Sequence, residues 1–152
     1  MATLRETLGR PVVQLGSGRS LGRVRDLLVD AQGRRVVALL LAPGTWFAPP
    51  RGIPWTQVQA LEPDRVVAVG EPVELAGLGR EVLTLEQLAA RSPYAAAEAA
   101  SLDDVDFQPG SGQVEGYQLS GGILQDLLDG RRYMAAERLA AELAPDDQAG
   151  LT

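Results

Sequence analysis

The chain of 152 residues contains no cysteine and no histidine, and all 14 of its cationic residues are arginine. Without cysteine and histidine the chain has no disulfides, thiolate nucleophiles, imidazole bases or usual nitrogen and sulfur ligands for zinc or iron. Without lysine, Schiff-base catalysis is also excluded. An enzyme built on this chain would rely on carboxylates, hydroxyls and arginine. We therefore expect a protein that is not an enzyme and that carries no cofactor and no metal.

Long apolar runs and an excess of positive charge are missing as well. The longest apolar run, residues 36–43, is far too short to span a bilayer. The first ten residues lack the apolar core and the cleavage site of a signal peptide. The net charge of −6 disfavours direct binding to nucleic acid, because such binding depends on a high density of cations. We expect a cytoplasmic protein, and its arginine-only usage indicates a bacterial genome rich in G and C.

The strongest positive signal is the segment from Leu21 to Leu41, in which two apolar runs flank a polar turn at Gly33. This pattern predicts two antiparallel strands around a tight turn. Residues 104–114 follow residues 26–36 at an offset of 78, residues 79–82 follow 9–12 at an offset of 70, and residues 131–134 follow 51–54 at an offset of 80. The chain is thus one β-rich unit written twice.

Helical signals distinguish the second copy from the first. Thr84 with Gln87 has capping-box spacing, and Ser92 followed by Pro93 is a second helix start, so residues 84–101 are predicted to be helical. Helical turns are also expected over residues 56–58 and 123–129, and good helix formers fill residues 135–143. Because of its prolines, the stretch 43–54 is not expected to contain a central strand.

Short motifs of turn glycines, arginines and core aliphatics occur in both copies. In the first copy they are Gly9-Arg10, Leu21-Gly22-Arg23-Val24-Arg25-Asp26, Gly33-Arg34-Arg35-Val36 and Arg51-Gly52-Ile53-Pro54. In the second copy they are Asp104-Val105, Gly112-Gln113-Val114, Glu115-Gly116-Tyr117 and Leu119-Ser120-Gly121-Gly122. Together they resemble the PRC-barrel family. The resemblance implies a small barrel of about six strands that serves in binding and assembly and has no catalytic residue set.

The expected fold is mainly β, with two PRC-barrel-like small β-barrel units. Unit 1 covers residues 1–74, the divergent unit 2 covers residues 75–145 and includes short helices, and residues 146–152 form a flexible tail. Nothing like the closing strand 65–69 follows in unit 2, so its barrel is predicted to be incomplete. An open sheet edge invites association, so the two halves pack on each other or a homodimer covers the edge.

Aromatic residues are concentrated in the proline-rich loop that follows the strongest strand. Trp46, Phe47 and Trp55, together with Arg51, are of the residue types that dominate binding hot spots. Large aromatics are usually buried, so our first interpretation is that they fill the barrel mouth or the contact between the copies. The alternative is an exposed partner-binding patch formed with Arg51.

One acidic stretch has the spacing of a calcium loop. Asp104, Asp106, Gln108 and Glu115 fall at positions 1, 3, 5 and 12 of that spacing. The glycine required at position 6 is replaced by Pro109, and strands rather than helices are expected on both sides. The stretch therefore favours a β-turn with an acidic edge in solvent.

Three functions remain open at this stage. The leading one is a non-catalytic protein-interaction or assembly module of the PRC-barrel type, with a protein partner of unknown identity. The second is an accessory factor that binds a ribosomal or RNA–protein surface. This reading follows from the family's ribosome-maturation branch and from arginines in residues 19–25 and 131–132, and the acidity opposes it. The third is a sensor that binds a small ligand at the barrel mouth.

Overall fold

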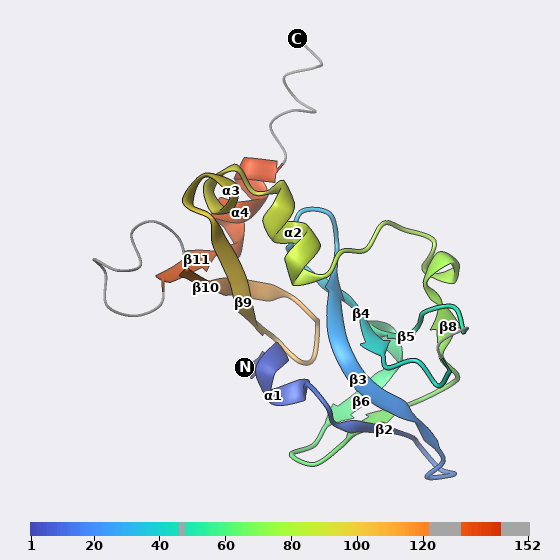
Figure 1. Cartoon of the computed structure of the whole chain (residues 1–152). Coiled ribbons are helices and arrows are strands. Elements are labelled where there is room, and N and C mark those ends of the chain that lie inside the picture. The colour runs from blue at the N-terminus through green and yellow to red at the C-terminus, as the bar shows by residue number, and fades with distance from the viewer. Residues whose placement is uncertain (46–47, 122–131, 144–152) are drawn as a thin grey trace.

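A computed structural model of the chain describes residues 1–45, 48–121 and 132–143 and shows two β-sheets (Figure 1). The larger sheet has seven strands in the order β6-β7-β2-β3-β4-β5-β8 and curls into a half-barrel. Its strands are β2 (Pro11–Gln14), β3 (Ser20–Val29), β4 (Val36–Leu41), β5 (Arg51–Pro54), β6 (Val58–Leu61), β7 (Val66–Ala68) and β8 (Val73–Glu74). The prediction of a mainly β fold is confirmed.

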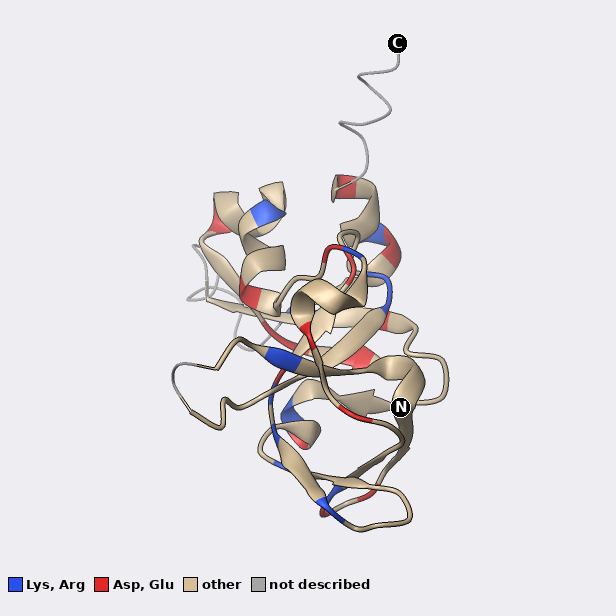
Figure 2. Cartoon of the chain, turned by 90° about the vertical axis from the view of Figure 1, so that its right-hand side faces the viewer, with Lys and Arg blue, Asp and Glu red and all other residues tan. Residues whose placement is uncertain are grey.

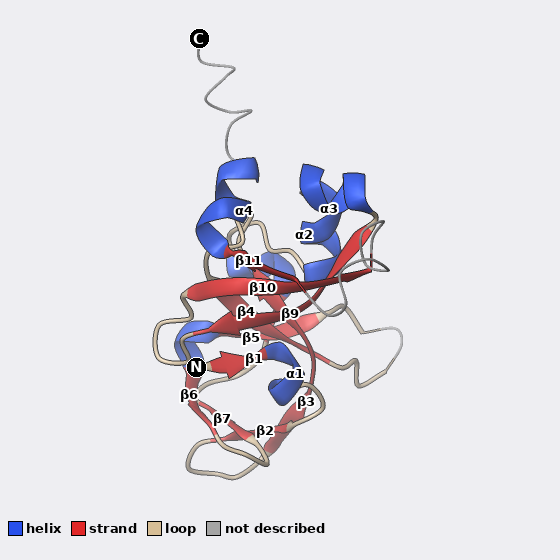
Figure 3. Cartoon of the chain, turned by 90° about the vertical axis from the view of Figure 1, so that its left-hand side faces the viewer, coloured by secondary structure: helices blue, strands red, loops and turns tan. Residues whose placement is uncertain are grey.

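The smaller sheet has four strands in the order β1-β9-β10-β11. Its strands are β1 (Ala2–Thr3), β9 (Ala100–Phe107), β10 (Val114–Gly121) and β11 (Arg132–Ala135). The helices are α1 (Leu4–Thr7), α2 (Leu85–Arg91), α3 (Pro93–Glu98) and α4 (Ala136–Leu143), with 3-10 turns η1 (Trp55–Gln57) and η2 (Leu75–Leu78). Figure 3 shows α2, α3 and α4 gathered at one end of the molecule.

The β3–β4 hairpin and the β9–β10 hairpin have the same register. Leu27 lies opposite Leu39 in the first hairpin, and Val105 lies opposite Tyr117 in the second, each residue 78 positions later. All five residue pairs of β3–β4 recur in this way, and the register shifts at the same two places. The internal repeat therefore extends from the sequence to the pairing of the strands.

The third strand of each copy also has an equivalent position. Ile53 of β5 lies opposite Leu39, and Met134 of β11 lies opposite Tyr117. The structural offset between β5 and β11 is therefore 81 residues, and the offset of 80 taken from the sequence is wrong by one position. The short η1 turn follows β5, whereas the longer α4 follows β11.

The start of each copy pairs with a strand of the other copy. Strand β1 places Ala2 antiparallel to Phe107 of β9. In the same way, Leu83 forms an antiparallel bridge with Val29 of β3, with both backbone hydrogen bonds 2.8 Å long. Phe107 lies 78 positions after Val29, so the two copies exchange equivalent segments reciprocally.

Helix caps mark the same equivalence. Thr3 caps α1 by accepting the amide of Glu6, and Thr84 caps α2 by accepting the amide of Gln87, at 3.2 Å in both cases. Residues 83–84 thus correspond to residues 2–3, and the expected match of 79–82 with 9–12 is wrong. The predicted capping box at Thr84 is confirmed.

The turns of the two hairpins meet back to back. The amide of Val36 donates to the carbonyl of Gly112 at 2.8 Å, and the amide of Val114 donates to the carbonyl of Arg34 at 2.9 Å. Since each donor and each acceptor has its counterpart 78 positions away, the contact is symmetric. The two hairpins are therefore related by a local approximate twofold axis at this contact, which we call the seam.

Buried side chains of both copies form one continuous hydrophobic core. At the seam the ring of Trp55 meets the ring of Phe107 edge to face, with centroids 5.3 Å apart. The Tyr117 hydroxyl donates to the carbonyl of Gly33 at 2.6 Å. The division of the chain near residue 74 stays a prediction, but the core crosses it.

The predictions for individual strands and helices are confirmed in part. The prediction that residues 43–54 contain no central strand is wrong at its end, because β5 lies between β4 and β8. Pro54 is the last residue of β5, and β8 pairs only with Arg51 and Gly52, so the missing amide lies outside that pairing. The predicted helical stretch 84–101 contains α2 and α3, but its end is wrong, because residues 100 and 101 belong to β9. The helix expected from the helix formers in 135–143 is present as α4. The expected helical turn at 123–129 and the tail 146–152 lie outside the described residues.

Candidate functional site

A groove of about 460 Å³ opens where the β3–β4 hairpin ends and the loop to β5 begins. We call it the β3–β5 groove. Its walls are mainly apolar, and two charged side chains stand at its rim. The lining includes Leu21, Leu41, Pro43, Pro49, Arg51 and Glu74.

Local sequence explains how the groove forms. Gly22 has a φ of +131°, and a side chain there would contact Leu41 across the strand pair at 3.6 Å. Because glycine has no side chain, the space beside Leu41 on this wall of the groove stays open, and the freedom of the glycine backbone allows β3 to bend. Pro43, Pro49 and Pro50 then fix backbone angles in the β4–β5 loop, which reduces the entropy that the loop loses on folding or binding.

The two charges at the rim are neighbours across the β5–β8 ladder. Arg51 lies opposite Glu74 in the strand register, and both side chains are exposed. Neither residue takes part in any ion pair found within the described ranges. The groove thus offers an apolar wall flanked by one cationic and one anionic group.

The predicted partner-binding residues have different positions. Arg51 lies on the groove, as an exposed site residue would. Trp55 is only 7% exposed and packs at the seam, so its side chain is removed from the partner-binding set. The burial of the Trp55 ring agrees with our first interpretation, in which the aromatic residues fill the barrel mouth or the contact between the copies. Trp46 and Phe47 lie outside the described residues.

Sequence reasoning missed the apolar and acidic side of the groove. Leu21 and Leu41 begin and end the segment that predicts two antiparallel strands, and Glu74 is the last residue of the predicted unit 1. The three residues are brought together by the pairing of β3 with β4 and of β5 with β8. Strand pairing alone reveals this neighbourhood, since Leu41 and Glu74 belong to no recognisable motif and the motif that contains Leu21 does not indicate a groove.

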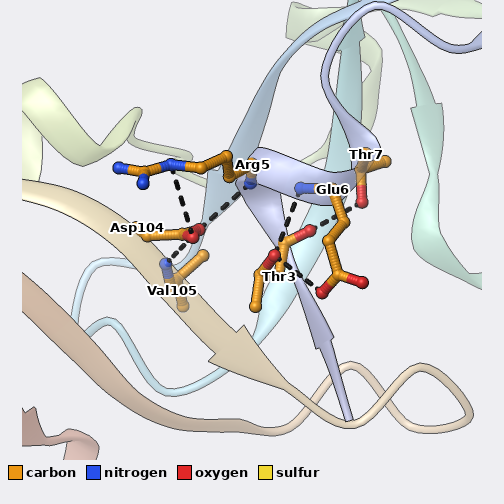
Figure 4. A network of polar contacts seen from close by, with 6 residues as sticks. All are labelled: Thr3, Arg5, Glu6, Thr7, Asp104 and Val105. Atoms are coloured by element: carbon orange, nitrogen blue, oxygen red, sulfur yellow. Dashed lines mark hydrogen bonds and ion pairs between the residues drawn. The ribbon is translucent and has the colours of Figure 1, made fainter.

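A polar network joins α1 to β9 on the other side of the molecule (Figure 4). The buried carboxylate of Asp104 accepts a hydrogen bond from the backbone amide of Arg5 at 3.1 Å. It accepts a second one from the backbone amide of the next residue, Val105, at 2.8 Å. The Arg5 guanidinium lies 4.0 Å from the same carboxylate. The network anchors the N-terminal segment on the second copy.

The fold raises the pKa values of several ionisable groups, among them Asp26, Asp106 and Tyr117. Burial raises the pKa of Asp26, and the charge of Glu86 adds to this rise. Burial and then the charge of Asp104 raise the pKa of Asp106. Burial also raises the pKa of the Tyr117 hydroxyl, which stays protonated and donates to Gly33. The groups lie on different strands and form no common cavity.

Within the described ranges, no three acidic residues come close enough to hold a metal ion. In the acidic stretch with calcium-loop spacing, Gln108 donates to Glu115 at 3.2 Å across the β9–β10 turn.

No helix in the part of the chain that the structure describes is long and apolar enough to cross a membrane. On the face shown in Figure 2, arginine positions are interspersed with acidic ones.

Comparison with known proteins identifies a domain family for the first copy. Residues 1–70 match the profile of the PRC-barrel domain. None of the curated proteins compared with the chain matches it. The match ends before the second copy, so a second PRC-barrel unit stays a prediction that the shared strand register supports. The matched region spans β1 to β7 and includes Arg51, so the chain contains a PRC-barrel domain in residues 1–70.

Proposed function

We propose that this protein is a non-catalytic protein-interaction module, in which the β3–β5 groove receives an apolar segment of a partner protein. The observation that carries the proposal is the groove itself, an apolar hollow with Arg51 and Glu74 at its rim. Protein-binding surfaces typically combine an apolar centre with a polar rim, and arginine is enriched at their hot spots. The missing lysine, histidine and cysteine side chains add weight to a binding role.

The two rim charges indicate the chemistry of the partner. A segment with an acidic side chain near Arg51 would form an ion pair at the rim, while its apolar residues contact Leu21 and Leu41. Burial of apolar surface supplies about 25 cal/mol per Å², and the rim charge fixes orientation and selects the partner.

Affinity capture from a native lysate tests the proposal. The wild-type protein and two charge reversals, Arg51→Glu and Arg34→Glu, serve as baits, and mass spectrometry quantifies the retained proteins. Arg34 is the matched control, because it is exposed at the turn of the same hairpin, at the end away from the groove. We expect at least one protein that wild type and Arg34→Glu retain equally and that Arg51→Glu retains at least fivefold less.

Two results would contradict the proposal. The first is an unchanged set of retained proteins for Arg51→Glu. The second is a metabolite that raises the melting temperature of wild type but not of Arg51→Glu, since this outcome assigns the groove to a small ligand instead.

A further inference from the structure

Strand β11 presents an edge that its counterpart in the first copy does not. The outer edge of β5 pairs antiparallel with β8, Arg51 opposite Glu74 and Gly52 opposite Val73. Strand β11 occupies the equivalent place in the second copy and pairs with β10 on its inner side. Among the described residues, no strand pairs with its outer side, where β11 forms the margin of the smaller sheet (Figure 1).

The sheet face beside this edge also differs between the copies. In the first copy the face is apolar, because Leu28 and Ala38 are buried and Leu75 of η2 lies over the strand pair near Gly52. The equivalent positions in the second copy are Asp106 and Gly116. A carboxylate thus replaces an apolar side chain, and a glycine replaces an alanine, where the second copy has no counterpart of η2 within the described ranges.

Tyr133 of β11 lies on this polar face. Its side chain is 55% exposed and crosses Gly116, where a Cβ atom would fall 2.1 Å from the Tyr133 hydroxyl oxygen. Asp106 lies opposite Gly116 in the strand register, and Glu115 is the residue before Gly116. After burial, the charges of these two carboxylates are the next causes that raise the pKa of Tyr133. The face therefore combines two carboxylates with an exposed aromatic ring, which suits a cationic ligand.

We propose that an extended basic segment of a partner protein adds to β11 as a fifth strand of the smaller sheet. Its backbone would pair with the outer edge of Arg132–Ala135, as β8 pairs with β5, and its cationic side chains would lie over Asp106, Glu115 and Tyr133. Strand addition of this kind draws affinity from backbone hydrogen bonds and specificity from alternate side chains. The net charge of −6 would steer a basic segment toward the protein.

A second copy of this chain is a poorer occupant of the same edge. Pairing β11 with itself in one continuous sheet would bring four residues from each chain together and place both acidic faces side by side. Stable interfaces bury at least about 1,000 Å², far more than two four-residue strands provide. Like charges across the contact would weaken the pairing further.

A labelled peptide of ten residues, in which arginine and valine alternate, serves as the probe. Fluorescence anisotropy measures its binding to the full-length protein. Two further peptides carry backbone N-methyl groups, one on every arginine and one on every valine, and both keep the charge of the parent. Because the amides of alternate residues face opposite edges of a strand, we expect one methylated peptide to lose at least tenfold in affinity and the other to bind like the parent.

Matched variants of the protein locate the site. Asp106→Asn is expected to weaken the parent peptide about fivefold, the effect of one charge pair at a rim. Asp64→Asn makes the same change at an exposed turn of the first copy and is expected to leave binding unchanged. Hydrogen exchange should show slower exchange of the amides in residues 132–135 when the parent peptide is bound.

Three results would overturn the proposal. The methylated peptides could both bind like the parent, which indicates attraction by charge alone. The peptide could bind without protecting residues 132–135. Ultracentrifugation could show a dimer that excludes the peptide, which assigns the edge to a second copy. None of these results concerns the β3–β5 groove, so the two proposals fail or stand separately.

Discussion

Gly33 is the residue at which the two copies are held most closely. Its φ of +69° is a conformation that other residues adopt at a cost, and its carbonyl accepts the Tyr117 hydroxyl at 2.6 Å. A Cβ atom at this position would lie 2.8 Å from the Tyr117 hydroxyl oxygen and 3.0 Å from Leu88 Cδ2. Glycine is therefore required both by the turn and by the packing of the other copy against it.

Replacement of this glycine should separate the two requirements. We expect Gly33→Ala to lower the free energy of unfolding by about 3 kcal/mol, from the positive φ together with the displaced tyrosine. Gly18→Ala is the control, because Gly18 has the same φ of +69° and nothing within 4 Å of the added atom. It should lower the free energy by only about 1 kcal/mol. Urea unfolding measures both, and equal losses would contradict a packing role for Gly33.

The turn glycine was predictable from the sequence, but its partner was not. A glycine between two apolar runs is typical of a tight turn, and the structure has such a turn at Gly33. The contact with Tyr117 joins residues 84 positions apart. Such a contact depends on how the copies meet, and local propensity carries no information on that.

At the scale of the elements, α1 and α2 occupy equivalent places with opposite electrostatics. Next to α1, the Arg5 guanidinium lies 4.0 Å from the buried carboxylate of Asp104 (Figure 4). Next to α2, the residue equivalent to Arg5 is Glu86, and its charge acts on Asp26, the equivalent of Asp104. One helix thus meets its strand with an ion pair and the other with like charges.

Burial, and to a smaller extent the charge of Glu86, raise the pKa of Asp26, which predicts a pH-dependent stability. The pKa of Asp26 is raised above its usual 3.8 in the folded protein, so the folded state holds this proton more tightly than the unfolded state. The resulting stability is fully present below about pH 3.8 and is lost as the pH rises through the folded pKa. Glu86→Arg should reduce that loss and raise the free energy of unfolding at pH 7 by about 0.5–1 kcal/mol.

Urea unfolding at pH 3 and at pH 7 measures this effect. The gain should be larger at pH 7, where Asp26 is charged, than at pH 3, where it is protonated. In an Asp26→Asn background the gain should largely disappear. Glu137→Arg makes the same change of charge in the first turn of α4, as Glu86→Arg does in the first turn of α2, and should give no comparable gain. A gain that is equal at both pH values would contradict the pairing with Asp26.

The elements were largely predictable, whereas their partners were not. Cap residues such as Thr84 and Ser92 identify α2 and α3 because capping is a local interaction. The β3–β4 hairpin is likewise local. The exchange of β1 and Leu83 between the copies depends on contacts across about 50 to 100 residues. The wrong match of 79–82 with 9–12 arose because a short glycine-arginine motif is less specific than a strand register.

At the scale of the whole molecule, the two copies share one hydrophobic core, and we expect them to unfold as one unit. In the first copy, Val29 pairs with Leu83, Trp55 packs against Phe107, and Gly33 accepts a hydrogen bond from Tyr117. We expect residues 1–74, produced alone, to show no cooperative urea unfolding, because these partners are missing. Near-ultraviolet circular dichroism and urea titration measure this.

Mixing the two halves provides the positive control. Residues 1–74 and 75–152 together should recover a cooperative transition, since the exchanged segments would re-form between the fragments. If residues 1–74 alone unfold cooperatively with a midpoint within about 1 M urea of the full chain, the single folding unit is contradicted.

The candidate site was less predictable than the fold. Residue type indicated Arg51, which does lie on the groove, but type alone could not separate Arg51 from the buried Trp55. An aromatic ring serves equally well in a core or on a binding surface, and the difference is decided by distant residues such as Phe107. Leu21, Leu41 and Glu74 form the groove only after the sheet has assembled.

The pairing of β1 with β9 also sets an order of events during synthesis. Ala2 and Thr3 are synthesised about a hundred residues before their partners, Phe107 and Asp106. At about 5–20 residues per second, β1 waits on the order of 5–20 seconds for its neighbour β9. During that interval the nascent PRC-barrel domain exposes the surface that α2 and β9 later cover. Strand β1 is thus made early and is among the last elements to reach its final place.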